Sequence, residues 1–184
     1  MSYNALLVLI ILIITVTMAG CTSNLGSVNN TSSFELRSTV LSNGGKIPVQ
    51  YTAQGKNISP PLSWTSVPIG TKSFAVVVSD LDSPNGVFNH WIIYNIPSNT
   101  TKLTEAIPTT GILVNGEEQG TNDFGTLGYS GPNPPSGTHR YIFTLYALNT
   151  RLNLDAGVKK EVFLKRITPS ILSQTTLTAT YTKK

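Results

Sequence analysis

The sequence predicts a mainly β domain, and three apolar segments carry that prediction. Ser73–Ser79, His90–Ile96 and Arg140–Leu148 are dense in β-branched and aromatic residues, which favour strands over helices. Each segment is apolar on both faces, as expected for a central strand that is covered on each side. The Gly-x-Gly-x-x-Gly motif of dinucleotide-binding folds and its parallel strand–helix–strand pattern are both missing, so no cofactor is expected.

The elements before the central strands are predicted from turn residues. Phe34–Val40 and Ile47–Thr52 flank a Ser-Asn-Gly-Gly turn, which is typical of a hairpin. Between the second and third central strands, the segment Pro97–Thr138 has little periodicity and is punctuated by Gly and Pro. A segment of that length inside a compact domain is usually functional.

The elements after the central strands are predicted from helical spacing and from alternation. Asp155–Ile167 carries apolar residues at helical spacing, with Asp155 as the N-cap. Pro169 cannot continue that helix and is predicted to open a short second turn that ends near Gln174. Alternation of apolar residues with threonines then predicts a last, half-buried strand through Leu177, Ala179 and Tyr181.

Size and composition narrow the class of protein. The 184 residues fit one domain, and 40% hydrophobic with 12% charged residues is enough to form a core. The net charge of +4 comes from basic residues scattered singly or in pairs, without a basic stripe interleaved with aromatics, so nucleic-acid binding is poorly supported. A single cysteine excludes a disulfide framework and a cysteine-rich zinc site.

The first 33 residues are predicted to lie outside the folded domain. Ala5–Val16 is an apolar run of the length of a signal-peptide core, and Ala19-Gly20-Cys21 follows it. This junction resembles a lipobox, although residues 1–4 lack the usual positive charge. We therefore expect a signal peptide over 1–20, a lipidated Cys21, a flexible tether over 21–33 and a domain over 34–184. The alternatives are an ordinary secretory signal and an uncleaved anchor. Both lipidation and secretion place the protein outside the cytoplasm. A lipidated protein would be anchored to the extracytoplasmic face of the cell membrane, and a secreted one would not be anchored.

Three polar residues lie at strand ends that should meet. Asp80 closes the first central strand and His90 opens the second, and the short loop between these strands predicts antiparallel pairing. If the third strand also runs antiparallel to the first, His139 emerges at the same edge of the sheet. Two imidazoles, a carboxylate and a Gly/Pro loop suit a bound anion, either phosphate or carboxylate.

Other interpretations of these residues are also open. Each histidine could simply bond a backbone carbonyl at a strand end, and Asp80 and Asp82 are ordinary turn residues. A His/His/Asp set could hold zinc, but no H-x-H or H-x-x-x-H spacing and no third histidine support a metal site. No nucleophile elbow and no Glu-x-x-His motif support catalysis, so the protein is not expected to be an enzyme.

Longer blocks of sequence resemble the phosphatidylethanolamine-binding protein family, in its prokaryotic Raf-kinase-inhibitor-like branch. The blocks are Asp80–Pro84, His90-Trp91, Asn122–Gly125 and Gly128–Tyr141. The likeness extends over almost all of the chain from Phe34 to Tyr181. The resemblance implies a large central antiparallel sheet, a smaller second sheet and a few peripheral helices.

The resemblance also implies a small anion pocket for phosphate-type groups such as lipid head groups. Matched residue by residue, the pocket would comprise Asp80, His90, Gly131, Pro132, His139 and Tyr141, with Asp82 and Pro84 in its wall. The leading hypothesis is a non-catalytic, membrane-tethered protein that binds a phosphate-bearing or carboxylate ligand. One alternative is an inhibitor of an extracytoplasmic serine protease, acting through the loop at Asn133 and Pro134. A metal-assisted hydrolase is the other alternative.

Overall fold

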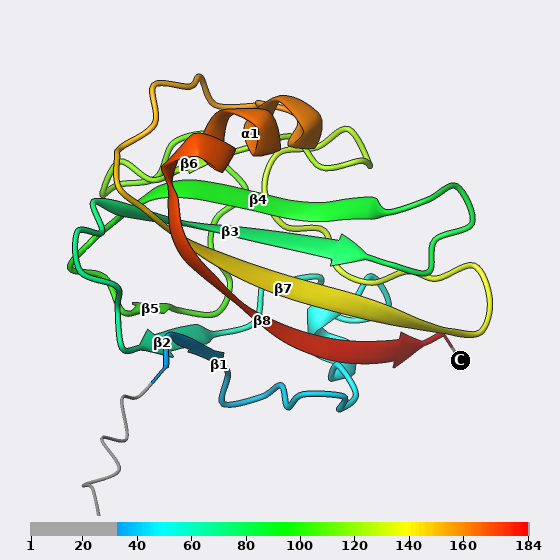
Figure 1. The fold of residues 1–184 in the computed structure, drawn as a ribbon. Coiled ribbons are helices and arrows are strands. Elements are labelled where there is room, and N and C mark those ends of the chain that lie inside the picture. The colour runs from blue at the N-terminus through cyan, green and yellow to red at the C-terminus, as the bar shows by residue number, and fades with distance from the viewer. Residues whose placement is uncertain (1–32, 184) are drawn as a thin grey trace, which may run out of the picture. The chain divides into compact units, whose positions relative to one another are not determined.

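The computed structural model describes residues 33–183 as two antiparallel sheets and one short α-helix (Figure 1). The predicted signal peptide, Cys21 and almost all of the tether lie outside the described residues. The small sheet has the strand order β1-β2-β5, and the large one has the order β6-β4-β3-β7-β8. The predicted mainly β class with a large and a smaller sheet is therefore confirmed.

The bounds of the elements follow the chain. The strands are β1 (Glu35–Arg37), β2 (Leu62–Thr65), β3 (Ser73–Asp80), β4 (Phe88–Pro97), β5 (Lys102–Leu103), β6 (Glu118–Gln119), β7 (Thr138–Leu148) and β8 (Ile171–Thr182). The helix α1 spans Lys160–Ile167, and two 3₁₀ turns span Val49–Tyr51 and Thr168–Ser170. In residues 33–183, no helix is both long and apolar enough to cross a membrane.

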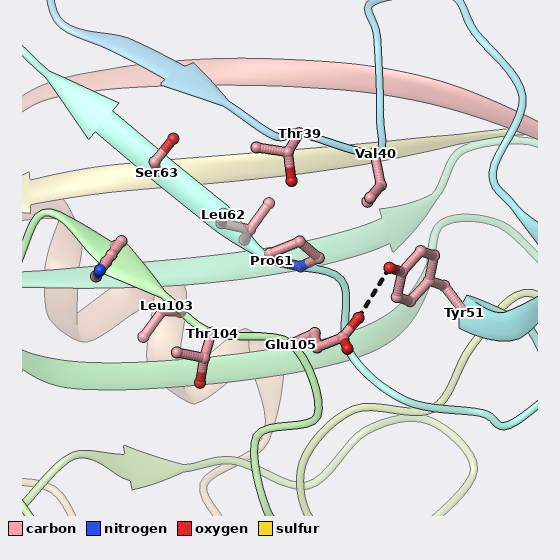
Figure 2. Close-up of a pocket in the computed structure, with 10 residues that line it drawn as sticks. Thr39, Val40, Tyr51, Pro61, Leu62, Ser63, Leu103, Thr104 and Glu105 are labelled. Atoms are coloured by element: carbon pink, nitrogen blue, oxygen red, sulfur yellow. Dashed lines mark hydrogen bonds between the residues drawn. The ribbon is translucent and has the colours of Figure 1, made fainter.

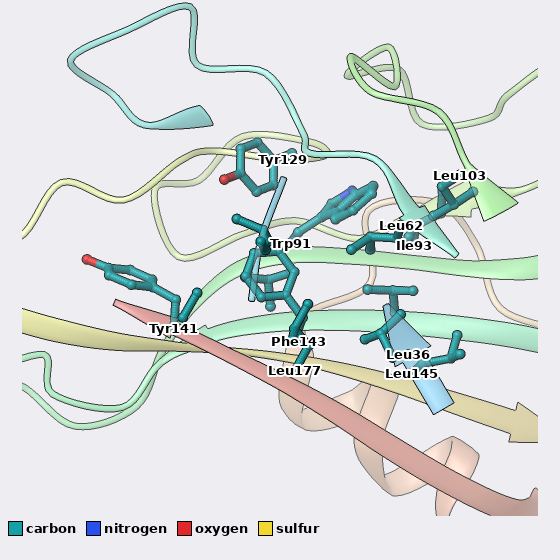
Figure 3. Packing of buried hydrophobic residues seen from close by; sticks show 14 of the residues in the cluster. Leu36, Leu62, Trp91, Ile93, Leu103, Tyr129, Tyr141, Phe143, Leu145 and Leu177 are labelled. Atoms are coloured by element: carbon teal, nitrogen blue, oxygen red, sulfur yellow. The ribbon is translucent and has the colours of Figure 1, made fainter. Parts of the chain in front are cut away.

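The large sheet is buried on both faces. Phe74, Val76 and Val78 of β3 pack in a core with the small sheet, and Figure 3 shows part of this cluster. The alternate residues Ala75 and Val77 pack in a second cluster that includes Phe163 and Ile167 of α1. This arrangement explains why β3 is apolar along its whole length, since successive side chains of a strand point to opposite faces.

The predicted hairpin over 34–40 and 47–52 is wrong. Residues Glu35–Arg37 pair instead with β2, and Val49–Tyr51 forms a 3₁₀ turn after Pro48. The Ser42–Gly45 turn does form, since the N–H of Gly45 donates to the carbonyl oxygen of Ser42 over 2.9 Å. The chain beyond it pairs with β8, so tertiary contacts override the local turn signal.

The predicted helix ends where expected but begins later. α1 starts at Lys160, with Lys159 rather than Asp155 as the N-cap. Gly157 has a φ of 87°, which a continuous helix does not permit, and the carbonyl of Asp155 accepts a hydrogen bond from Tyr94. The second turn ends at Ser170 rather than near Gln174, because β8 pairs with β7 from Ile171 onward.

The outer edge of β8 is covered over part of its length by the segment 44–47. The N–H groups of Gly44 and Ile47 donate to the carbonyls of Thr178 and Thr180 over 2.7 and 2.8 Å, and Thr180 donates back to Gly45 over 2.7 Å. The bridge between Lys46 and Thr180 is parallel. This short segment therefore acts as an extra strand along β8 from Thr178 to Thr180.

Candidate functional site

Asp80 and His139 form a buried pair at one edge of the large sheet. β3 runs antiparallel to β7, and Asp80 lies opposite Tyr141. The Nδ1–H of His139 donates to Oδ2 of Asp80 over 2.7 Å, and both side chains are less than a tenth exposed. The other oxygen of Asp80 accepts the N–H of Asp82 over 2.8 Å. The carboxylate thus fixes the ring of His139 and the start of the loop after β3.

His90 reaches the same edge through a β-bulge. Val78 pairs with Trp91 and Ser79 pairs with Asn89, so the register skips His90. Trp91 packs in the core with the small sheet, and the His90 ring lies 5.3 Å from the Tyr141 ring of that same core. Regular alternation would place neighbouring residues on opposite faces, so the extra residue of the bulge is what turns His90 toward this side.

The hydrogen bonding of His90 decides its tautomer. Its Nδ1 lies 2.6 Å from the carbonyl oxygen of Ser130, which can only accept, so Nδ1 carries the hydrogen. The Nε2 atom of the neutral ring is then an acceptor. Burial, which outweighs the hydrogen bond to Ser130 and the nearby charges of Asp80 and Asp123, lowers the pKa of His90. The ring is therefore neutral at pH 7.

A cavity of about 240 Å³ opens in front of Asp80 and His90. Of the predicted residues, Asp80, His90 and Pro84 line it. Six residues that were not predicted for the site complete the wall: Ser83, Asn85, Phe88, Phe124, Asn133 and Pro135. No Lys or Arg lines this cavity, so its wall carries no fixed positive charge.

His139 and Tyr141 lie behind this wall rather than on it. His139 acts through Asp80, and the Tyr141 ring packs edge-on against His90. The Tyr141 hydroxyl is buried and has no hydrogen-bond partner among residues 33–183, and its burial raises the pKa of the phenol. Figure 3 shows this hydroxyl directed away from the rest of the apolar cluster.

Gly131 and Pro132 do not line the cavity of Asp80 and His90. The N–H of Gly131 donates to Oδ1 of Asn57 over 2.7 Å, so it is not free to bind an anion. A Cβ at Gly131 would lie 2.4 Å from the carbonyl oxygen of Tyr51, which explains the glycine. Gly131 lines a neighbouring cavity, and the buried Pro132 accepts a hydrogen bond from the N–H of Ala53 over 3.0 Å.

Asp82 ties its loop to β7 instead of lining the cavity. Arg140 donates to the Asp82 carboxylate through Nε at 2.9 Å and Nη2 at 2.7 Å, and also through its backbone N–H. These hydrogen bonds from the Arg140 side chain lower the pKa of Asp82 to about 2. Arg140 is thus already paired with Asp82.

The wall of the cavity is held from behind by Asn122. This buried side chain donates to the Gly128 carbonyl over 2.9 Å and to Ser130 Oγ over 3.0 Å, and its Oδ1 accepts the N–H of Phe124 over 3.0 Å. One side chain therefore positions both Phe124 and the Ser130 carbonyl that orients His90. The surrounding residues resembled the family, but nothing in the sequence pointed to this arrangement.

A sequence profile of phosphatidylethanolamine-binding proteins matches residues 37–182. The chain belongs to this family. The predicted family is therefore confirmed, whereas the lipoprotein signal stays a prediction.

Relatives of this chain occur in archaea and bacteria. A UPF0098 protein of Methanothermobacter thermautotrophicus is 48% identical over 79% of this chain and 97% of its own length. A UPF0098 protein of Aquifex aeolicus is 43% identical over 80% of this chain and 87% of its own. These relatives consist mostly of the region that corresponds to the domain.

Solved structures of family members have the same fold. A phosphatidylethanolamine-binding protein homologue of Chlamydia trachomatis is 37% identical, with a TM-score of 0.75 over 83% of this chain and 99% of its own. Escherichia coli YbcL, described as a new member of the mammalian PEBP family, is 32% identical, with a TM-score of 0.74 over 82% and 99%.

The domain has a further cavity, of about 420 Å³, between the small sheet and the 3₁₀ turn at Val49–Tyr51 (Figure 2). There the Tyr51 hydroxyl donates to Oε2 of Glu105 over 3.0 Å. None of the predicted site residues lines this cavity. In residues 33–183, no group of three or more His, Cys, Asp and Glu side chains is placed to hold a metal ion.

Proposed function

We propose that this protein binds a small phosphate-type or carboxylate ligand in the cavity of Asp80 and His90, without catalysing a reaction. The observation that carries the proposal is the convergence of three polar residues, distant in the sequence, around one open cavity. Asp80 and His90 line it, and His139 lies behind the wall and donates to Asp80. Membership of the phosphatidylethanolamine-binding protein family supports a binding role.

The charge of the cavity indicates how an anion would bind. Its only ionisable lining groups are Asp80 and the neutral His90, so a bare anion would meet a carboxylate and a lone pair. A proton that arrives with the anion changes this, because a protonated His90 donates from Nε2 while Nδ1 stays bonded to Ser130. The phosphate or carboxylate ligand is therefore proposed to bind together with a proton.

The loop proposed for protease inhibition gains no specific support. Asn133 and Pro135 are exposed and line the cavity, whereas Pro134 at the centre of the loop is buried. An inhibitory loop would have to present these residues to a protease, so the ligand-binding role is the one proposed.

The binding role is tested by titrating residues 33–184 with inorganic phosphate and following backbone amide shifts by NMR. The solved relatives consist almost wholly of the matched region, so this part of the chain is expected to fold on its own. The expected shifts lie at Ser83, Asn85, His90 and Asn133. Saturable shifts confined to other surfaces, or none at millimolar phosphate, would contradict the proposal.

Proton-coupled binding predicts a pH dependence with a definite sign. The pKa of His90 is lowered in the free protein, and a bound anion would raise it. Affinity should therefore increase as pH falls through the neutral range toward the lowered pKa of the free His90, by up to about tenfold per pH unit. Sulfate is the suitable probe, since its own charge is constant in this range. Calorimetry in two buffers of different ionisation enthalpy would report the proton uptake. An affinity that does not change with pH, without proton uptake, would refute proton-coupled binding.

We also propose that the protein is anchored outside the cytoplasm through a lipid on Cys21. The support is the sequence around Ala19-Gly20-Cys21 alone. In cells that make the full chain, mass spectrometry should find the lipid on an N-terminal Cys21 in the membrane fraction. Cys21→Ser should move the protein out of that fraction, and an unmodified Cys21 would contradict the anchor.

A further inference from the structure

A second cavity adjoins the one that contains His90. It measures about 230 Å³ and is lined by Ala53, Asn57, Phe124, Ser130, Gly131 and Asn133. Phe124 and Asn133 line both cavities, so the two cavities are neighbours. Since one water occupies about 30 Å³, the second cavity has room for several heavy atoms of a ligand.

The walls of this second cavity are fixed by hydrogen bonds from both sides. Ser130 is bound twice to β4, because its N–H donates to the His90 carbonyl over 3.0 Å and its carbonyl accepts from His90 Nδ1 over 2.6 Å. Next to Ser130 in the chain, Gly131 donates its N–H to Oδ1 of Asn57, which has a φ of 57°. The second cavity is therefore preformed, and Ser130 couples it directly to His90.

The chemistry of the wall selects the kind of group that fits. None of the six lining residues is ionisable. Asn57 uses its Oδ1 for Gly131, which leaves the two N–H donors of Nδ2 for another partner, and the amide of the exposed Asn133 can donate and accept. With the Phe124 ring as an apolar surface, this set suits hydroxyl groups on a short carbon chain. An ammonium group would find no carboxylate there.

We propose that the second cavity binds the uncharged, hydroxylated part of a phosphomonoester whose phosphate lies beside His90. The preferred ligand would then be a polyol phosphate or sugar phosphate rather than free phosphate or phosphoethanolamine. This inference rests on the proposed anion site and adds the class of ligand. Phe124 and Asn133 would contact both halves of the ligand.

The test is calorimetry of residues 33–184 with inorganic phosphate, glycerol 3-phosphate and phosphoethanolamine. Two added hydrogen bonds of typical net strength correspond to about tenfold in affinity, so glycerol 3-phosphate should bind about tenfold more tightly than phosphate. Phosphoethanolamine should stay within about threefold of phosphate.

A variant that fills the second cavity separates the contributions of the two halves of the ligand to its affinity. Ala53 is exposed and its side chain makes no hydrogen bond, so Ala53→Trp should remove the gain of glycerol 3-phosphate and leave phosphate affinity unchanged. Val49→Trp, at an exposed position of the nearby 3₁₀ turn and outside both cavities, is the matched control and should keep the gain. Ala53→Met is the smaller replacement if the tryptophan variant does not fold.

The outcomes distinguish this inference from the function on which it rests. Glycerol 3-phosphate that binds no more tightly than phosphate, or a gain that survives Ala53→Trp, overturns the subsite and leaves the anion site standing. Tighter binding of phosphoethanolamine than of glycerol 3-phosphate overturns the class of ligand. No binding of any of the three anions overturns both proposals.

Discussion

Asp80→Ala is expected to lower the free energy of unfolding by about 3–5 kcal/mol, because it leaves a buried partner without its counterpart. His139 loses the acceptor of its Nδ1–H, and the N–H of Asp82 loses the other carboxylate oxygen. Both side chains of the pair are almost fully buried, so water cannot easily replace the lost bonds. Urea unfolding at pH 7 measures the loss directly.

A double-mutant cycle separates the effect of the Asp80–His139 hydrogen bond on stability from the effect of lost side-chain volume. His139→Ala should also destabilise, and the double variant should be less destabilised than the sum of the two single variants, since neither partner is then left alone. Asp80→Asn keeps the size and an acceptor oxygen, so it is the matched control and should cost clearly less. A loss below about 1 kcal/mol for Asp80→Ala would refute a structural role for the pair.

His90→Phe is expected to weaken phosphate binding by about 10- to 100-fold, the worth of one hydrogen bond to a charged group. Phenylalanine preserves the ring contacts with Phe88, Phe124 and Tyr141, which have centroid distances of 5.3, 5.4 and 5.3 Å, but it has no Nε2. The increase of affinity at low pH should disappear in the same variant. Calorimetry with phosphate and with sulfate at two pH values checks both effects.

Asn85→Ala provides the control for this variant. Asn85 lines the same cavity from an exposed loop but offers no titratable group, so its replacement should change phosphate affinity less than about threefold. Wild-type affinity in His90→Phe would show that phosphate binds elsewhere. Equal losses of phosphate affinity in His90→Phe and Asn85→Ala would show that the imidazole does not bind the phosphate specifically.

The position of Asp80, His90 and His139 at one edge of the sheet could be predicted because the shared edge depends only on strand direction. Short connections between apolar strands imply antiparallel pairing, and antiparallel pairing brings the end of one strand beside the start of the next. The pairing of β3 with both β4 and β7 confirms that prediction. Gly131, Pro132 and Tyr141 were predicted as pocket residues from the family resemblance alone. The structure places these three near the cavity of Asp80 and His90 but not on its wall.

Other features depend on contacts that a local pattern does not contain. The hairpin failed because residues 44–47 find partners in β8, more than 130 positions later, instead of in the segment across the turn. The bulge at His90 is a property of its pairing with β3, and the sequence of β4 alone does not mark it. Phe124 enters the wall because Asn122 folds its turn, so its role becomes visible only in three dimensions.

The segment 44–47 has a consequence for solubility. A sheet edge with free N–H and C=O groups can recruit a strand from another molecule and so start aggregation. Here β8 is one of the two edge strands of the large sheet, and Gly44, Gly45 and Ile47 use the backbone groups around Thr178 and Thr180 that a second molecule would otherwise take. A protein shortened past residue 47 would lose this cover, and a chain that retains it keeps the sheet from growing beyond one molecule at that point.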